Sequence, residues 1–283
     1  MQGRCRNVRG VRTDPVEMHY SRGNLMEMID VGLAESGLDP QHLEFDTLAP
    51  IEEFHAFGRA ATVALAGAVE LSKADRVLDV GSGIGGAARL IARDFGCHVT
   101  GVDLTDEFCR VARELNRRVG LDEQIDIRRG DALDLPFVDG EFSVVWTQHM
   151  SMNIADKQRL YAEMRRVVPP GGRLAFFDIL AGPNQPIHFP VPWAKDERVS
   201  FLASALETQA IIASAGFRTQ LWEDVTEDAI DFYKLASALT PGALPPLGLH
   251  LVIPNLAENL ANLKRNAEEG RIIVVRCVAE AVA

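Results

Sequence analysis

Apolar and polar positions alternate with two different periods along this chain, and its middle part switches repeatedly between them. Short apolar runs predict strands at 76–80, 98–102, 125–129, 142–146 and 172–179. Spacing of three and four residues predicts helices between or after these runs, at 86–95, 106–119 and 157–167. Strands that alternate with helices predict an α/β fold, with a doubly wound, mostly parallel sheet and helices on both faces.

The pattern changes after this alternation. Loops rich in Pro and Gly are expected at 181–200 and 241–250, helices at 204–215, 227–239 and 256–268, and two further strands at 218–224 and 271–279. We therefore expect residues 73–283 to form one domain, with lid insertions at about 181–200 and 226–269.

The first quarter of the chain has helical spacing without any strand pattern. Two helices, 15–37 and 51–71, are predicted to form an N-terminal helical cap over residues 15–72. Residues 1–14 carry four arginines, and we expect them to form a flexible basic tail.

Composition excludes several classes of protein. The formal net charge of −11 argues against a nucleic-acid-binding face on the folded body. No apolar run is long enough to span a bilayer, and the N-terminus lacks a signal-peptide core, so no membrane partner is expected. The four cysteines are scattered, which predicts free thiols in a cytoplasmic protein. No metal-ligand spacing is present, and a homodimer is possible.

The segment with most chemical content runs from Val77 to Gly86, Val-Leu-Asp-Val-Gly-Ser-Gly-Ile-Gly-Gly, a strand followed by a glycine turn and a helix start. Glycines let the backbone turn sharply and approach a ligand, and the helix start adds amide donors. Dinucleotide dehydrogenases share such a turn. Asp79, however, precedes the first glycine by two positions, where a carboxylate suits an ammonium group and repels a pyrophosphate.

Three more polar elements follow the ends of predicted strands. They are Asp103-Leu104, Asp131-Ala132 and Gln148-His149. The carboxyl ends of parallel strands meet at one edge of the sheet, where α/β proteins bind ligands. An acid at the end of the second strand can accept hydrogen bonds from both ribose hydroxyls, and an acid after the third can accept one from an adenine amine.

Taken together, these elements resemble the class I (Rossmann-like) methyltransferases, which use S-adenosylmethionine. The resemblance covers residues 76–180 and includes Pro169-Pro170-Gly171-Gly172, a turn that the family usually writes K-P-G-G. It implies a seven-stranded sheet whose last strand is antiparallel. It also implies transfer of a methyl group to an acceptor, with release of S-adenosylhomocysteine.

The resemblance also implies where the cofactor binds. Gly81, Gly83 and Gly85 are expected to line its methionine part, Asp103-Leu104 its ribose and Asp131-Ala132 its adenine. Outside the core, stretches such as 53–59, 152–157 and 188–193 resemble bacterial sarcosine and dimethylglycine N-methyltransferases. That similarity implies a small-molecule acceptor, either an amine or an N or O atom of a natural product.

Several residues have two interpretations. His149 is either the base for an acceptor that must lose a proton or a buried structural histidine, and Gln148 is expected beside it at the cofactor. Tyr20 either closes over the sulfonium, with a second possible role as base, or packs in the core. Arg59 binds either the cofactor carboxylate or a neighbouring glutamate.

The acceptor side is expected to include His55, His188, Trp193 and His250. Three other functions stay open at this point. They are C-methylation of an isoprenyl diphosphate or an aromatic ring, nicotinamide-dependent oxidoreduction, and cofactor binding without transfer.

Overall fold

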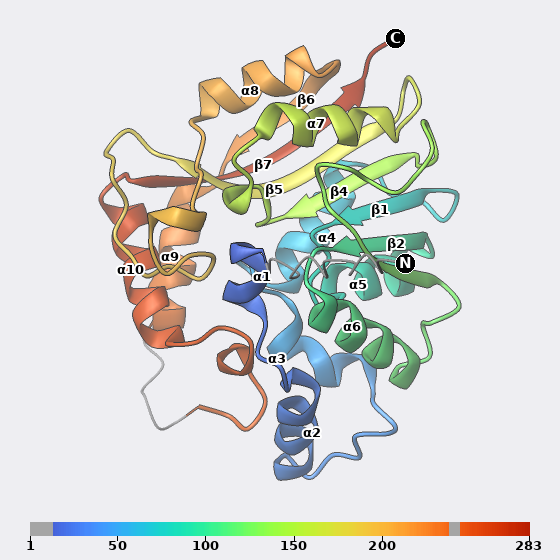
Figure 1. Cartoon of the computed structure of the whole chain (residues 1–283), viewed down its shortest axis with the longest axis vertical. Helices are drawn as coiled ribbons and strands as arrows, with labels where there is room; N and C mark the ends of the chain where they lie inside the picture. The colour runs from blue at the N-terminus through green and yellow to red at the C-terminus, as the bar shows by residue number, and fades with distance from the viewer. Residues whose placement is uncertain (1–13, 238–243) are drawn as a thin grey trace, which may run out of the picture.

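The computed structural model describes residues 14–237 and 244–283, and these form one seven-stranded sheet with helices on both faces (Figure 1). The strand order is β3-β2-β1-β4-β5-β7-β6, and β7 runs antiparallel to both of its neighbours. The strands are β1 Arg76–Val80, β2 His98–Asp103, β3 Ile125–Arg129, β4 Val144–Gln148, β5 Arg173–Ala181, β6 Phe217–Asp224 and β7 Ile272–Ala281. The predicted fold class is confirmed.

Alternation within the strands explains the two helical layers. Val77 of β1 packs in one hydrophobic cluster with α4 and α5, whereas its neighbours Leu78 and Val80 pack in another with α7 and α8. The helices are α1 Pro15–Tyr20, α2 Leu25–Glu35, α3 Ala49–Glu52, α4 Arg59–Ala68, α5 Gly86–Phe95, α6 Asp106–Arg118, α7 Lys157–Arg166, α8 Ala205–Ser214, α9 Thr226–Ser237 and α10 Leu256–Glu268. Among the described residues, no helix is both long and apolar enough to cross a bilayer.

The fourth strand begins two residues later than predicted and ends at Gln148 rather than at Trp146. Phe142 donates its amide hydrogen bond to the carbonyl of Val167, and parallel pairing with β5 starts at Val144. As a result, Gln148 is the last residue of the strand, and His149 is the first residue beyond the sheet edge.

The prediction of one helix over residues 15–37 was wrong, because the chain breaks between α1 and α2. The Glu107 carboxylate, from α6, accepts hydrogen bonds from the backbone amides of Arg22, Gly23 and Leu25, at 2.6, 2.8 and 2.8 Å. Gly23 has a φ of 82°. Three hydrogen bonds from backbone amides to one carboxylate favour this turn over a continuous helix.

The second cap helix is interrupted as well. After α3 the chain leaves the helical conformation, and Phe57 and Gly58 both have positive φ, 65° and 52°. The helix resumes as α4. The segment between α3 and α4 places three side chains, Glu53, Phe54 and His55, on the cavity described below.

The predicted basic tail falls almost entirely on residues 1–13, which lie outside the described residues. Residues from both segments predicted as lid insertions line the cavity described below, and their role as lids stays a prediction. Residues 182–204 form a loop with a short 3₁₀ helix at Glu197–Val199. In the connection that leads from β6 to β7, α9 packs against α10 (Figure 1).

Candidate functional site

The glycine turn after β1 has the backbone conformation that its glycines predict. Gly81, Gly83 and Gly85 have φ values of 79°, 54° and 85°, a region that residues with a side chain avoid. The Gly81 amide donates to the carbonyl of Val102 at 2.8 Å, which joins the turn to β2. A Cβ on Gly81 would lie 2.3 Å from Cγ of Met150, so this position also needs glycine for space.

Two carboxylates border this turn, Asp79, which is buried, and Asp103, which is half-buried. Asp103 accepts hydrogen bonds from the amides of Gly83 at 2.9 Å and Thr105 at 2.8 Å, and burial raises its pKa in spite of both bonds. Asp79 is 3% exposed, and its Oδ2 has no hydrogen-bond partner. Burial, and then the charges of Glu53 and Asp103, raise the pKa of Asp79 to about 8.

Two carboxylates that lie close together and are shielded from water are unfavourable unless a positive charge lies nearby. Glu53 adds a third carboxylate, with an Oε1 atom that is also buried and unpartnered. The arrangement fits a ligand that brings a cationic group to the glycine turn.

A cavity of about 810 Å³ opens at the carboxyl ends of β1, β2 and β4. Its floor includes the glycine turn and the ends of the strands, and its walls include the cap, the segment 192–201, α9 and α10. Ligand sites range from about 300 to 1,000 Å³. This volume lies near the upper end of that range, which leaves room for two ligands.

His149 is held in an uncommon conformation at the cavity wall. Its φ is 46°, its ring stacks on Phe177 at 5.1 Å between centroids, and its amide donates to the Phe177 carbonyl at 2.8 Å. Burial, and then the charge of His55 at 5.8 Å between ring centroids, lower the pKa of His149 well below its usual 6.5. The imidazole is therefore neutral near pH 7, and its Nε2 is buried without a partner.

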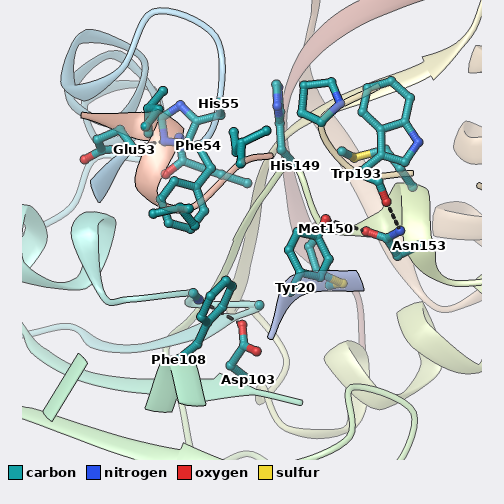
Figure 2. Close-up of a pocket in the computed structure, with 18 of the residues that line it drawn as sticks. Tyr20, Glu53, Phe54, His55, Asp103, Phe108, His149, Met150, Asn153 and Trp193 are labelled. Carbon is teal, nitrogen blue, oxygen red and sulfur yellow. Dashed lines mark hydrogen bonds and ion pairs between the residues drawn. The ribbon is translucent and has the colours of Figure 1, made fainter. Parts of the chain in front are cut away.

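The cap segment supplies a buried ion pair beside this ring. Nε2 of His55 lies 2.5 Å from Oε2 of Glu53. Oγ1 of Thr62 lies 3.0 Å from Oε2 of Glu53 and 3.0 Å from Oε1 of Gln148. Through this chain of contacts the cap is joined to the end of β4. Figure 2 shows His149 between the Glu53–His55 pair on one side and Trp193 on the other.

Tyr20 joins the cap to the opposite wall. Its hydroxyl donates to Oδ1 of Asn153 at 2.9 Å, and the Asn153 amide donates to the carbonyls of Trp193 at 2.9 Å and Val199 at 2.8 Å (Figure 2). Burial, and then the charges of Asp103 and Asp178, raise the pKa of Tyr20. The hydroxyl thus keeps its proton and acts as a donor.

Comparison with known proteins identifies the core. Residues 78–176 match the family described as "Methyltransferase domain". Residues 78–176, from β1 into β5, therefore form a methyltransferase domain.

Relatives of the methyltransferase domain act on different molecules. Over 132 residues the chain is 38% identical to glycine/sarcosine/dimethylglycine N-methyltransferase of Actinopolyspora halophila. The aligned region covers 47% of this chain and 23% of that protein. Over 171 residues it is 30% identical to 27-O-demethylrifamycin SV methyltransferase of Amycolatopsis mediterranei. This second aligned region covers 58% of this chain and 61% of that protein. The chain thus matches less than two thirds of the length of either relative.

The fold extends further than the sequence similarity. The solved structure of geranyl diphosphate C-methyltransferase from Streptomyces coelicolor superposes with a TM-score of 0.70 at 18% identity, over 95% of this chain and 99% of that one. At this identity the match concerns the fold alone.

Most residues that the sequence predicts for the site line this one cavity of the methyltransferase domain. They are Tyr20, His55, Asp79, Gly81, Gly83, Asp103, Leu104, Asp131, Ala132, Gln148, His149, Trp193 and His250. Asp131 is exposed and accepts the Leu133 amide at 2.8 Å, whereas Trp193 is 2% exposed and donates its indole N–H to Ser200.

Three predicted residues do not line the cavity. Arg59 forms ion pairs with Glu52 and Asp46, so its guanidinium is already engaged within the cap. Gly85 faces Arg89 and Ala112, so its small size serves packing between α5 and α6. His188 lies 2.9 Å from a carboxylate oxygen of Glu269, beside α10.

Two residues that border the cavity were not predicted as site residues. Glu53 and Asn153 fall in stretches that carry a family resemblance, but neither belongs to a motif with a defined spacing. The local signal is the short separation of Glu53 and His55 in the sequence, and their side chains are in contact in the structure.

Proposed function

We propose that this protein transfers a methyl group from S-adenosylmethionine to a small-molecule acceptor and releases S-adenosylhomocysteine. The observation that carries the proposal is the unpartnered carboxylate of Asp79 beside the glycine turn of a methyltransferase domain. A buried acid with a raised pKa is stabilised by a cation, and the methionine ammonium group is one.

The residues present fit the rest of the cofactor. Gly81 and Gly83 present backbone without side chains to its methionine part, Asp103 has free lone pairs for ribose hydroxyls, and Asp131 with Ala132 borders the adenine. When bound, S-adenosylmethionine supplies an activated methyl group. The protein therefore has to align the acceptor atom with that group and exclude water.

Tyr20 and His149 act on the acceptor side of this alignment. Tyr20, fixed by Asn153, places an aromatic face where a sulfonium is favourable. His149 stays neutral near pH 7, so it can take a proton at an imidazole nitrogen from an acceptor hydroxyl. An acceptor amine that arrives deprotonated needs no such step. His55, Trp193 and His250 wall the acceptor region.

A binding experiment tests the cofactor. Calorimetry with S-adenosylmethionine, S-adenosylhomocysteine and NAD should show binding of the first two alone. Tight binding of NAD, without binding of the other two, would replace this proposal with an oxidoreductase. Asp103→Ala should weaken cofactor binding by roughly 1–3 kcal/mol, through the loss of charged hydrogen bonds. Unchanged affinity would remove Asp103 from the site.

A turnover experiment tests transfer. His149→Ala should slow methylation of a hydroxyl acceptor and leave cofactor affinity close to that of the wild type. His98→Ala is the matched control, because His98 is exposed and does not line the cavity. Normal turnover in His149→Ala would make that residue structural. Homodimer formation and a cytoplasmic location stay predictions.

A further inference from the structure

The cavity is divided into two chemically different halves. Asp79, Asp103 and Gln148 belong to the sheet edge, where the proposed cofactor binds. The other half lies against α9, α10 and the segment that precedes α10. Its lining is dominated by apolar side chains such as Phe57, Phe232, Leu249, Leu256, Leu260 and Leu263.

Aromatic contacts close this apolar half around His149. The rings of Phe57 and Phe232 lie 5.4 Å apart, which joins the cap to α9. Phe57 also lies 6.0 Å from Phe177, on which His149 stacks. The apolar wall therefore begins at the residue that faces the acceptor atom in the proposed reaction.

The charged side chains around the cavity are mostly acidic. Its described lining contains seven Asp or Glu residues, no Lys, and a single arginine, Arg198. The Arg198 side chain is 80% exposed and is paired with Asp196 at an atom separation of 2.6 Å. A phosphate or carboxylate on the acceptor would lose its hydration without gaining an unpaired counter-charge, because His55 already pairs with Glu53, and acids at the sheet edge would repel it.

The apolar half still offers a neutral polar contact. The hydroxyl of Tyr233, on α9, is buried and has no hydrogen-bond partner. Burial raises the pKa of Tyr233, so this hydroxyl is an uncharged donor. It suits a carbonyl, ether or hydroxyl oxygen on a molecule that is otherwise apolar.

We propose that the acceptor is an uncharged, mainly apolar molecule, larger than an amino acid, that binds between α9 and α10 and presents its nucleophilic atom at His149. This inference rests on the proposed methyl transfer and narrows it. Amino acids, phosphorylated amines and isoprenyl diphosphates are excluded as acceptors, because each carries an anionic group.

Three naphthalene probes test the inference, since they share one ring system and differ in charge. With the protein saturated with S-adenosylhomocysteine near neutral pH, uncharged 2-naphthol should bind at least about ten-fold more tightly than 2-naphthoate or 2-naphthyl phosphate. Equal or tighter binding of either anion overturns the inference.

Two variants of α9 locate the binding site. Phe232→Ser should weaken 2-naphthol binding roughly ten-fold, through lost apolar contact. Leu235→Ser is the matched control, since Leu235 lies one turn away, is 76% exposed and does not line the cavity. Thermal unfolding of both variants establishes that they fold. A folded Phe232→Ser variant with unchanged 2-naphthol affinity overturns the assignment.

Binding of S-adenosylhomocysteine separates this inference from the proposed function. If S-adenosylhomocysteine binds and 2-naphthol has no advantage over the anions, the acceptor class is wrong and the methyl transfer stands. If 2-naphthol binds selectively but neither S-adenosylmethionine nor S-adenosylhomocysteine binds, the apolar site stands and the methyl transfer fails.

Discussion

Glu53 and His55 form an ion pair within the wall of the cavity, with Oε2 and Nε2 2.5 Å apart and side chains that are 3% and 6% exposed. Nδ1 of His55 lies 3.1 Å from the carbonyl oxygen of Ala56. Both ring nitrogens thus face an oxygen atom of a neighbouring residue. The cap brings to the cavity an acid that already has a partner.

Replacing Glu53 by Gln should destabilise the protein. The hydrogen bond and charge of His55 lower the pKa of Glu53 against the effect of burial, so the carboxylate is ionised in the folded protein. Loss of one partner of a buried ion pair costs about 3–5 kcal/mol. Urea unfolding measures this. Glu44→Gln, an exposed acid of the same cap, is the control, and equal stability of the two variants would contradict the account.

A second prediction concerns pH and Asp79 in the cofactor-free protein. The unfolded chain loses this proton near a pKa of 3.8, whereas the folded protein holds it up to about 8. Between these values folding takes up a proton, so the free energy of unfolding falls as the pH rises. Asp79→Asn should remove this fall and be more stable near pH 8, on the order of a few kcal/mol.

The same substitution should weaken binding of S-adenosylmethionine, because an amide does not neutralise an ammonium group. Unfolding at a series of pH values, with Asp122→Asn as an exposed control, measures stability, and calorimetry measures affinity. In the wild type, binding should release a proton, so the observed enthalpy should depend on the buffer. An enthalpy independent of the buffer would show that Asp79 does not change its protonation.

The sheet and its ligand-binding edge were predictable because their signals are local. Each central strand is a short apolar run. Asp79 lies next to the last residue of β1, Asp103 is the last residue of β2, and Asp131 follows β3 by two positions. The break between α1 and α2 was not predictable in this way. It depends on Glu107, which lies 82 residues beyond Leu25 in the chain.

The role of Glu53 is hidden from sequence for a similar reason. Its pairing with His55 is local, but its proximity to Asp79 exists only because α3 packs against the start of α5. Arg59 illustrates the reverse case. The sequence left two partners open for it, the cofactor carboxylate and a neighbouring glutamate, and the folded cap pairs it with Glu52.

Gly81 packs closely against Met150, so replacing it should destabilise the protein. Gly81→Ala should cost roughly 1–2 kcal/mol for positive φ and a further 1–3 kcal/mol for contact with Met150. Gly23→Ala isolates the first effect, because Gly23 has a φ of 82° and no atom within 4 Å of the added Cβ. Urea unfolding compares the two variants. A cost at Gly81 no larger than at Gly23 would mean that Met150 moves aside freely.

The position of the cap over the glycine turn depends on the ion pair between Glu52 and Arg89. Both side chains are fully buried, and the Arg89 guanidinium donates to Oε2 of Glu52 from Nη2 at 2.9 Å and from Nε at 3.1 Å. Arg89→Met should cost about 3–5 kcal/mol, because it leaves a buried carboxylate with one partner fewer. Glu52→Gln should cost a similar amount, because Arg89 then lacks its counter-charge.

The double variant should cost about 1–3 kcal/mol less than the sum of the single variants, since the two residues interact directly. The four proteins of this cycle are compared by urea unfolding. Arg110→Met is the surface control: its ion pair with Asp106 has a similar 3.0 Å separation but is largely exposed, so its loss should cost no more than about 1 kcal/mol. If Arg89→Met lowered the free energy of unfolding no more than Arg110→Met does, apolar contacts would hold the cap in place. The buried ion pair would then fix only the orientation of the cap.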